Sequence, residues 1–358
     1  MHSSHSENIV TYRILDAAAN RAREGLRVLE EYVRFVQDDA DLSSQLKNCR
    51  HQLATILQAI DLNTLLKSRE TLQDVGTSIS TATESERASL ASVVTANFKR
   101  LQEALRTLEE YSKLISPTAA EEISQLRYTT YTLEKAITNS SRNQQVFEGR
   151  SLYLLLTAKS CQQEIEFVLQ EALAGGVDIV QLREKKMNDG DLLPLARKVC
   201  QITKQAGALF IMNDRPDIAL LANADGLHIG QEELSVKEAR KIVGADSLIG
   251  VSTHDIEQAK QAVLDGADYL GVGPTFPSKT KSFDNFSGLP FIQQVANEIS
   301  LPWFAIGGIS EENLSDVINA GASRIAVSHA ICRNNKPQQA AKQLKKKLAT
   351  NSTTQKTK

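Results

Sequence analysis

The stretch VDIVQLREKKMNDGDLLPLARKVCQITKQAGALFIMND, residues 177–214, decides the fold class of the second half of the chain. It places two short apolar runs, VDIVQLR (177–183) and LFIMND (209–214), on either side of an amphipathic helical stretch. Apolar runs rich in Val, Ile and Leu are typical of strands that are buried on both faces of a parallel sheet. The alternation therefore predicts a β–α–β unit.

The same rhythm continues on both sides of this stretch. The remaining apolar runs are LYLLLT (152–157), GLHIG (226–230), LIGVS (248–252), DYLGVGP (268–274), PWFAIGG (302–308) and RIAVS (324–328). Eight β/α units at such even spacing favour a (β/α)₈ TIM barrel over a doubly wound open sheet. We therefore expect an α/β fold, with the barrel at residues 150–345 and a polar tail at residues 346–358.

Residues 1–140 differ in composition and predict an all-α domain ahead of the barrel. From residue 10 onward this part contains almost no glycine and one proline, Pro117. Leu, Ala, Glu, Arg and Gln dominate, and these residues form helices readily. Apolar residues recur at three- and four-residue spacing, as at Leu26, Leu29 and Val33, which is the pattern of an amphipathic helix.

An internal repeat lies within this helical part. The segment EGLRVLEEY (24–32) returns as EALRTLEEY (103–111). Two such similar segments indicate two related helices, as an old duplication would produce. The polar run NSSRNQQ (139–145) follows the helical part and is expected to be the linker to the barrel.

The overall composition argues against several kinds of partner. The 358 residues carry a net charge of −2, which gives no electrostatic reason to expect nucleic acid or an anionic membrane. No apolar run approaches the ~18 residues of a membrane span. We expect a cytoplasmic enzyme acting on small molecules, and the sequence leaves a homo-oligomer open. Cys49, Cys161, Cys200 and Cys332 form no C-x-x-C pair and are expected to be buried or incidental thiols.

Candidate functional residues follow the predicted strands, because the active site of a TIM barrel lies at the carboxyl ends of its strands. In chain order they are Gln181, Arg183, Lys185, Asn213, Asp214, Gln231, Glu232, Glu233, Ser252, His254, the loop at 274–281, Gly307, Gly308, Ser328 and His329. Polar groups from seven of the eight β/α connections would thus meet at one rim. His254, and His228 within the fourth run, are expected to be structural.

Asp214 and Glu233 follow neighbouring strands and are candidate Mg²⁺ ligands. Mg²⁺ is usually held by one or two carboxylates together with substrate phosphate. Two alternatives stay open at this point: Asp214 caps the following helix, or Glu233 lies on a solvated face while Glu232 competes for the role.

Basic residues and glycines on the same rim suggest phosphate binding. Arg183, Lys185 and Lys281 would supply positive charge to a diphosphate, with a solvated surface lysine as the alternative for Lys281. Gly307-Gly308 and Ser328-His329 follow the seventh and eighth strands, where barrels commonly bind a phosphate through backbone N–H groups. The alternative is that the glycines only permit tight turns.

Six of these motifs together resemble the thiamine phosphate synthase family. They are QLREK (181–185), IMND (211–214), HIGQEE (228–233), GVSTH (250–254), GPTFPSKTK (273–281) and AIGGI (305–309), in order along the chain. Members of that family join a pyrimidine methyl diphosphate to a thiazole ethyl phosphate and release pyrophosphate. The resemblance implies this activity, the TIM barrel and a Mg²⁺ cofactor.

The resemblance also implies residue roles. The pyrimidine diphosphate would be bound by Gln181, Leu182, Arg183, Glu184, Lys185, Asn213, Ser252 and Lys281. The thiazole phosphate would be bound by Ser278, Lys279, Thr280, Gly308, Ser328 and His329. Asp214 and Glu233 would hold Mg²⁺, and Lys281, Arg183 and Ser252 would be the catalytic residues.

Three positions depart from the family pattern. Glu233 stands where Asp is common, Ser278 replaces Thr, and His329 stands where a small residue such as Ser is usual. Glu keeps the carboxylate and Ser keeps the hydroxyl, and a turn that binds through its N–H tolerates His. The chemistry of the site is therefore expected to survive, although Glu233 with its longer side chain could bind the ion through water.

Rival interpretations remain for each half of the chain. The barrel could be a related thiazole tautomerase, although that activity would not need QLREK or the carboxylate pair. In the helical half, NRAREGLRVLEEYVRF (20–35) resembles a domain that is fused ahead of such synthases and linked to pyrimidine phosphate kinase activity. Arg21, Arg23 and Arg27 could then hold a phosphate beside the polar loop at 74–77. The alternatives are a non-catalytic docking module and a solvated helix face with charge pairs.

Overall fold

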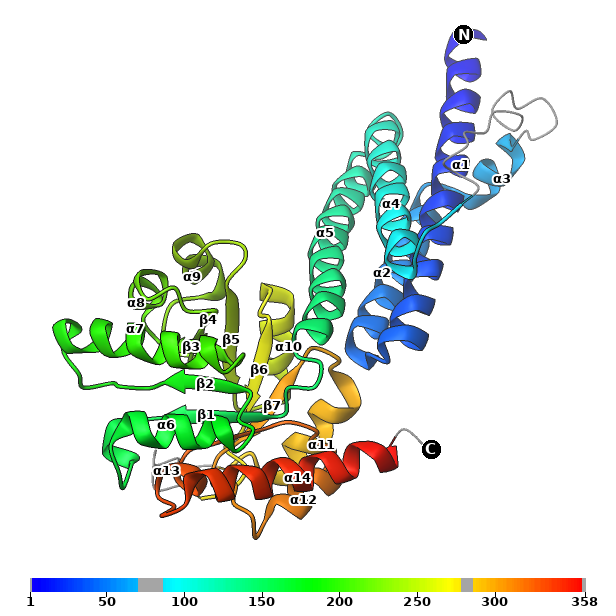
Figure 1. Cartoon of the computed structure of the whole chain (residues 1–358). Coiled ribbons are helices and arrows are strands. Elements are labelled where there is room, and N and C mark those ends of the chain that lie inside the picture. The colour runs from blue at the N-terminus through cyan, green and yellow to red at the C-terminus, as the bar shows by residue number, and fades with distance from the viewer. Residues whose placement is uncertain (1, 70–85, 278–285, 356–358) are drawn as a thin grey trace. The chain divides into compact units, whose positions relative to one another are not determined.

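The computed structural model describes residues 2–69, 86–277 and 286–355 (Figure 1). Ser278, Lys279, Thr280, Lys281 and the loop at 74–77 lie outside these ranges. The chain divides into two compact units, Met1–Thr138 and Asn139–Lys358. Within the described residues, no helix combines the length and the apolar character that crossing a membrane requires.

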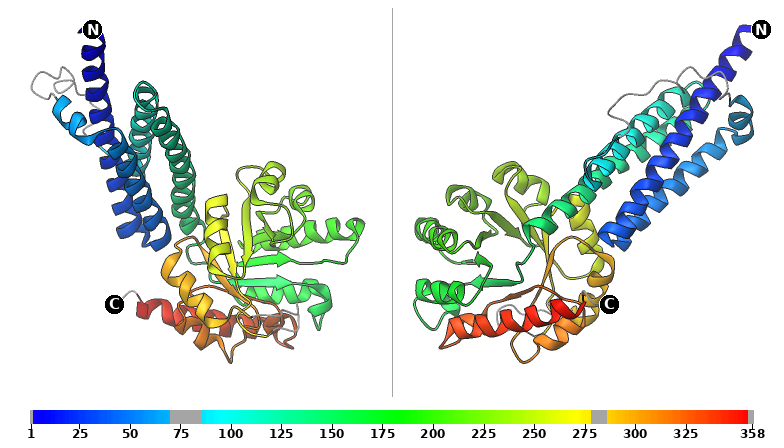
Figure 2. Two further views of the ribbon diagram at one scale, coloured as in Figure 1. Left: turned by 180° about the vertical axis from the view of Figure 1, so that it is seen from behind. Right: turned by 45° about the vertical axis from the view of Figure 1, so that its right-hand side comes forward.

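The first unit is all-α, as the composition predicts. Its elements are α1 (His2–Tyr32), a π-helical turn (Val33–Gln37), α2 (Ala40–Ala59), α3 (Leu62–Ser68), α4 (Leu90–Ser112) and α5 (Pro117–Val146), whose last residues belong to the second unit. Helix α2 begins at Asp39, whose carboxylate accepts a hydrogen bond from the N–H of Leu42 at 2.8 Å. Helices α1 and α4 lie side by side (Figure 2).

The two copies of the internal repeat lie on α1 and α4 and make the same contacts. Glu30 on α1 accepts a hydrogen bond from Arg50 on α2 at 3.1 Å. Glu109 on α4, the matching position, accepts one from Arg127 on α5 at 2.8 Å. Both carboxylates are buried. The unit therefore contains two helix pairs, each joined by a glutamate–arginine pair, which agrees with the prediction of two related helices.

The second unit is a closed barrel of eight parallel strands in sequence order, which confirms the predicted fold class. Its strands are β1 (Leu152–Leu156), β2 (Ile179–Leu182), β3 (Leu209–Asn213), β4 (Gly226–Ile229), β5 (Leu248–Thr253), β6 (Tyr269–Val272), β7 (Trp303–Ile306) and β8 (Ile325–Val327). Seven of them lie within one of the predicted apolar runs, and β5 extends one residue beyond its run, to Thr253. The runs are apolar along their whole length because the barrel interior covers one face of each strand and the helices cover the other.

Helices lie between the strands and after the last strand, on the outside of the barrel (Figures 1 and 2). They are a 3₁₀ turn (Ala158–Ser160), α6 (Ile165–Ala174), α7 (Asp189–Gln205), α8 (Pro216–Leu221), α9 (Val236–Val243), α10 (Ile256–Asp265), α11 (Gly288–Glu298), α12 (Leu314–Asn319), α13 (His329–Cys332) and α14 (Pro337–Gln355). Residues 346–355, expected to belong to a polar tail, continue α14.

Three aspartates organise the amino-terminal end of the barrel. Asp178, Asp225 and Asp268 each precede an even-numbered strand by one residue. Each accepts a hydrogen bond at 2.8 to 2.9 Å from a backbone N–H at or beside the start of the preceding strand. These bonds satisfy donors that the sheet leaves unpaired at its end, so these carboxylates stabilise the fold and lie away from the carboxyl ends of the strands.

The expected linker at residues 139–145 is helical, because these residues form the end of α5, and the two units divide at its first residue. Their polar side chains bond to the amino-terminal end of the barrel. Asn139 donates to the carbonyl of Ala267 at 2.8 Å, and Asn143 donates to the carboxylate of Asp268 at 2.9 Å. A polar run that reads as a loop thus folds as a helix, since tertiary contacts use its amide groups.

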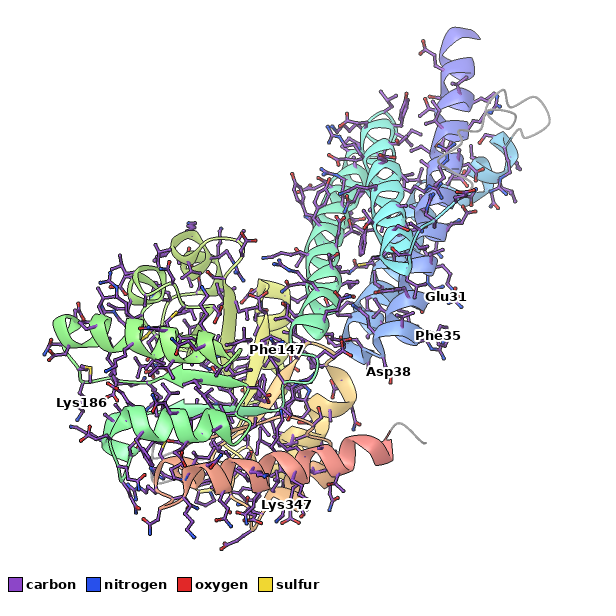
Figure 3. The ribbon with its side chains drawn as sticks, in the orientation of Figure 1. Glu31, Phe35, Asp38, Phe147, Lys186 and Lys347 are labelled. Carbon is purple, nitrogen blue, oxygen red and sulfur yellow. The ribbon has the colours of Figure 1, made fainter. Side chains whose placement is uncertain are left out.

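Phe147, directly after α5, closes the amino-terminal end of the barrel (Figure 3). Its ring is fully buried and lies 5.2 Å from the ring of Tyr269 and 5.7 Å from that of Phe304, centroid to centroid. Tyr153 belongs to the same apolar cluster. The interior is therefore packed at its amino-terminal end, and the active site of such a barrel lies at the opposite end, where the strands have their carboxyl ends.

Candidate active site

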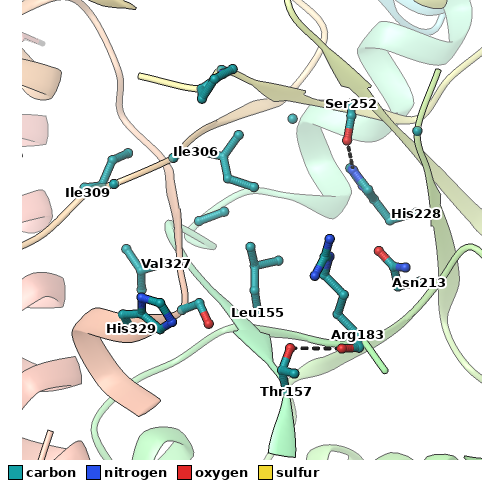
Figure 4. Close-up of a pocket in the computed structure, with 18 of the residues that line it drawn as sticks. Leu155, Thr157, Arg183, Asn213, His228, Ser252, Ile306, Ile309, Val327 and His329 are labelled. Atoms are coloured by element: carbon teal, nitrogen blue, oxygen red, sulfur yellow. Dashed lines mark hydrogen bonds between the residues drawn. The ribbon is translucent and has the colours of Figure 1, made fainter. Parts of the chain in front are cut away.

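A cavity of about 620 Å³ lies at the carboxyl ends of the strands (Figure 4). Nine of the residues to which the resemblance assigns a role line it: Arg183, Lys185, Asn213, Asp214, Glu233, Ser252, Gly308, Ser328 and His329. The further candidates Gln231, Glu232, His254 and Gly307 line it as well. Gln181, Leu182 and Glu184 do not. The barrel thus brings together residues from six of its β/α connections, as expected from strand position alone.

A carboxylate pair lies on one wall of the cavity. The ammonium of Lys185 is 3.0 Å from a carboxylate oxygen of Asp214 and 3.5 Å from one of Glu233. Asp214 has a left-handed backbone, with φ of 59°, and its N–H donates to the carbonyl of His228 at 2.8 Å. This bond turns the chain at the end of β3 so that Asp214 meets Glu233, which follows β4.

Gly230 makes room for the side chain of Glu233. A Cβ atom at position 230 would lie 2.3 Å from a carboxylate oxygen of Glu233, far inside van der Waals contact. The absence of a side chain at Gly230 therefore allows the longer glutamate to fold back toward Asp214. This contact compensates for the extra methylene that distinguishes Glu233 from the aspartate common in the resembling family.

The donor set of this wall fits a Mg²⁺ ion. Two carboxylates already converge on one cation, the Lys185 ammonium, and the remaining ligands of Mg²⁺ are usually waters and substrate phosphate oxygens. No group of three or more His, Cys, Asp or Glu side chains with metal-binding geometry occurs among the described residues. An ion here would accordingly depend on substrate oxygens, as Mg²⁺ in phosphate-binding sites commonly does.

Arg183 points into the cavity from the end of β2 (Figure 4). Its backbone is fixed on both sides, since its N–H donates to the carbonyl of Leu156 and its carbonyl accepts from the hydroxyl of Thr157, both at 2.9 Å. Among the described residues no carboxylate pairs with its guanidinium. A guanidinium held in this way can bind a diphosphate through two parallel hydrogen bonds.

A chain of hydrogen bonds crosses the barrel interior below the cavity. Gln181 donates its amide N–H to the hydroxyl of Tyr153 at 2.9 Å, and that hydroxyl lies 2.9 Å from the hydroxyl of Tyr269. The Tyr269 hydroxyl is 3.1 Å from Nδ1 of His228, and Nε2 of His228 is 2.9 Å from the hydroxyl of Ser252. Gln181 thus reaches the cavity through this chain rather than through its own side chain.

Burial sets the protonation of this chain. Burial away from water lowers the pKa of His228 to about 4. The negative charge of Asp214 raises this pKa by a smaller amount, and the positive charge of Arg183 lowers it by a still smaller amount. His228 is therefore neutral at pH 7. Gly250 leaves space for the chain, because a Cβ there would lie 2.1 Å from the Tyr269 ring.

Glycines after β7 form the opposite wall. Gly307 and Gly308 have φ values of 101° and 64°, which favour glycine. A Cβ at Gly307 would lie 2.7 Å from Cα of Pro274, and one at Gly308 would lie 2.7 Å from the carbonyl oxygen of Pro277. The turn therefore packs directly against the loop after β6, next to Ser328 and His329.

Comparisons with known proteins agree with this geometry. A family model for thiamine monophosphate synthase matches residues 152–331. The thiamine-phosphate synthase of Nostoc punctiforme is 42% identical over 92% of this chain and 91% of that one, and the enzyme of Gloeobacter violaceus is 44% identical over 91% and 93%. The chain belongs to the thiamine-phosphate synthase family. The solved thiamine phosphate pyrophosphorylase of Pyrococcus furiosus matches 56% of this chain and 96% of its own, with a TM-score of 0.52 and 30% identity.

The helical unit has a match of its own. A model of the ThiD2 family covers residues 13–136, which includes both copies of the internal repeat. Because the relatives match more than nine tenths of this chain, the chain shares both of its parts with them. The resemblance noted for residues 20–35 is thereby confirmed at the level of the family.

Sequence reasoning missed two residues next to the candidate active site. Tyr153 and Tyr269 sit inside predicted strands and read as ordinary apolar positions, yet their hydroxyls bond to each other in the interior. The signal was Gly250 in the neighbouring strand, because a glycine within a strand often marks close approach of another group. Glu184, which the resemblance assigns to the pyrimidine diphosphate site, accepts a hydrogen bond from the N–H of Ala158.

Proposed function

We propose that the barrel condenses 4-amino-2-methyl-5-(diphosphooxymethyl)pyrimidine with 4-methyl-5-(2-phosphooxyethyl)thiazole to give thiamine phosphate and pyrophosphate. The observation that carries this proposal is the division of the cavity into two polar walls. One wall holds Arg183 with the carboxylate pair, and the other holds the Gly308 turn with Ser328 and His329. One phosphorylated substrate on each wall would place their reacting atoms between them.

Asp214 and Glu233 are proposed to hold Mg²⁺ at the first wall. When bound, Mg²⁺ supplies charge neutralisation for the departing pyrophosphate. Arg183 and Lys185 bind the diphosphate oxygens, with Lys185 poised between the two carboxylates in the structure. These residues stabilise negative charge where it develops, which is the largest effect available to an enzyme of this kind.

The reaction proceeds by departure of pyrophosphate before attack. The bond between the methylene carbon and the diphosphate oxygen breaks, and the electron-rich aminopyrimidine stabilises the resulting cation. The thiazole nitrogen then forms its bond to that carbon. The protein positions both rings and keeps water out, which the apolar cavity residues Leu155, Ile306 and Val327 favour.

Ser252 and Asn213 are proposed to bind the pyrimidine side of the cavity together with Gln181, Leu182 and Glu184, whose place here rests on the resemblance. Lys281 and residues 278–280 are proposed on the same ground to complete the thiazole phosphate site and the charge of the diphosphate site. For the helical unit we retain two predictions, a pyrimidine phosphate kinase and a non-catalytic docking module. A cytoplasmic location and a homo-oligomer also stay predictions. A thiazole tautomerase would leave the carboxylate pair without a role, so we favour the synthase.

The test is synthesis by the purified full-length protein with both substrates. We expect thiamine phosphate and pyrophosphate in equal amounts with Mg²⁺, no product with EDTA, and a fall of about 100-fold or more in kcat for Asp214→Ala. Asp189→Ala is the matched control, because Asp189 is an exposed carboxylate that pairs with Arg215 outside the cavity. Product formation that is indifferent to both EDTA and Asp214→Ala would disprove the metal assignment. Absence of product from folded protein would disprove the proposed activity.

A further inference from the structure

Two cysteines that are distant in sequence meet beside the thiazole phosphate wall. Cys161 follows the 3₁₀ turn after β1, and Cys332 is the last residue of α13, after β8. Strands β1 and β8 are neighbours because the barrel closes. The N–H of Gln162 donates to the carbonyl of Cys332 at 3.1 Å, so the two chain segments are hydrogen-bonded next to the cysteines.

Both thiols contact backbone carbonyl groups at the end of β1. The sulfur of Cys161 is 3.4 Å from the carbonyl oxygen of Thr157, and that of Cys332 is 3.8 Å from the carbonyl oxygen of Leu155, two residues away at the end of β1. The interaction between the two thiols lowers the pKa of Cys332 and, together with burial, raises the pKa of Cys161.

We propose that Cys161 and Cys332 form a reversible disulfide that controls the thiazole phosphate wall. The two cysteines differ in their exposure to solvent: Cys161 is half-buried, whereas Cys332 is fully buried. Such a pair needs one thiol that a reagent can reach and a second thiol beside it. Cys161 therefore reacts first with an incoming reagent and Cys332 resolves the product. The formation of the bond does not depend on the proposed function, but its effect on catalysis does.

The co-reactant is a small disulfide such as oxidised glutathione, written RSSR. Cys332, whose thiol has the lowered pKa, loses its proton to solvent and then accepts the proton of Cys161. The resulting Cys161 thiolate attacks one sulfur of RSSR and releases one RS⁻. The sulfur of Cys332 then attacks the mixed disulfide at Cys161 and releases the second RS⁻. The two thiol protons end on two RSH molecules, so RSSR is reduced as the cysteine pair is oxidised.

The bond would move residues that line the cavity. A disulfide holds its sulfurs about 2.05 Å apart, much closer than two hydrogen-bonded thiols. Cys332 carries α13, which also contains His329 and Ala330 of the cavity wall, and Cys161 lies four residues after Thr157. Oxidation therefore pulls α13 toward β1 and displaces the Ser328–His329 turn, while the Asp214–Glu233 wall keeps its place.

Peptide mapping of the full-length protein tests the bond itself. After incubation with oxidised glutathione and blocking of free thiols, trypsin should yield residues 160–183 linked to residues 325–333, with the loss of two hydrogens. Cys161→Ser and Cys332→Ser should each abolish the linked peptide. Cys200→Ser is the control, because Cys200 has similar exposure but its thiol bonds to the carbonyl of Asn223. Separate capping of the two cysteines without a link would overturn the proposal.

Kinetics test the consequence. We expect oxidation to raise the KM for the thiazole phosphate about tenfold, with a smaller effect on the KM for the pyrimidine diphosphate, and dithiothreitol to restore it. Cys161→Ser should be insensitive to the oxidant, whereas Cys200→Ser should respond like the parent protein. A linked protein with unchanged KM would overturn control of the wall. Reduced protein without synthase activity would refute the proposed function and leave the mapping result valid.

Discussion

Glu233 reaches the carboxylate pair only because residue 230 has no side chain. Gly230→Ala would place a Cβ 2.3 Å from the present position of the Glu233 carboxylate. The neighbouring group is the free end of a flexible side chain, and Gly230 does not have a positive φ, so the fold should tolerate the change while Glu233 moves. We expect the Mg²⁺ concentration for half-maximal activity to rise about tenfold, measured by titrating Mg²⁺ at saturating substrates.

A double-mutant comparison isolates this effect. Adding Gly230→Ala to a Glu233→Ala protein should change the Mg²⁺ requirement little, since the displaced group is already absent. Equal effects of Gly230→Ala in the presence and absence of Glu233 would show that the alanine acts elsewhere.

His228 makes the stability of the barrel depend on pH. Its pKa of about 4 in the folded protein lies below the ~6.5 of an exposed histidine. Between these values the unfolded chain binds a proton that the folded protein does not, so stability falls as pH decreases from about 6.5 to 4. The contribution is about 2 kcal/mol at pH 5 relative to pH 7.5. The fluorescence of Trp303, the single tryptophan, reports barrel unfolding in urea at the two pH values.

The matched variant for this measurement is His228→Asn, which removes the titrating group. We expect it to be less stable at pH 7.5 but to lose about 2 kcal/mol less than the parent protein on acidification. The quantity to compare is the change in the free energy of unfolding with pH in the parent protein and in the variant. Carboxylates elsewhere titrate in both proteins, so only the difference between the two changes reports on His228. Parallel slopes would contradict a neutral buried His228.

At the scale of elements, the two glutamate–arginine pairs of the helical unit should contribute unequally. The Arg127 side chain is 10% exposed, whereas the Arg50 side chain is 31% exposed. Arg127→Met removes a hydrogen-bonding partner of the buried Glu109 carboxylate and should lower the free energy of unfolding by about 3 kcal/mol. Arg50→Met should lower it by about 1 kcal/mol. Urea unfolding followed by far-UV circular dichroism measures both. Equal losses would mean that burial does not distinguish the two halves of the duplication.

The elements of the barrel could be predicted because a strand that is buried on both faces must be apolar throughout, and this signal is local in sequence. The position of Asp214 and Glu233 followed from the same logic, since parallel strands end at one rim. The end of α5 could not be predicted, because Asn139 and Asn143 become helical through bonds to the barrel. Neither could the meeting of Cys161 with Cys332, which depends on the closure of β1 onto β8.

At the scale of the whole molecule, the barrel begins before its first strand. A fragment that starts at residue 139 keeps the end of α5 and Phe147, whereas one that starts at residue 148 opens the amino-terminal end of the core. Removing a buried phenylalanine ring costs about 3 to 5 kcal/mol. We expect the fragment 139–358 to unfold cooperatively and the fragment 148–358 to be less stable by at least that amount, as measured by Trp303 fluorescence in urea.

Phe147→Ala in the full chain is the control for that comparison, because it removes the ring without cutting the chain. It should be destabilised by about 3 to 5 kcal/mol and should retain the hydrogen bonds of Asn139 and Asn143. Two fragments of equal stability, or a full-length variant as stable as the parent, would show that the ring does not close the core.

The hydrogen-bond chain under the cavity has a direction. In the arrangement in which each tyrosine hydroxyl both accepts and donates, Tyr153 accepts from Gln181 and donates to Tyr269, and Tyr269 donates to Nδ1 of His228. The neutral imidazole then has its hydrogen on Nε2 and donates it to Ser252. The hydrogen of the Ser252 hydroxyl is thereby left for the cavity. In this arrangement the orientation of the Gln181 amide sets the direction of every bond in the chain, and a ligand at Ser252 accepts a hydrogen bond through a lone pair.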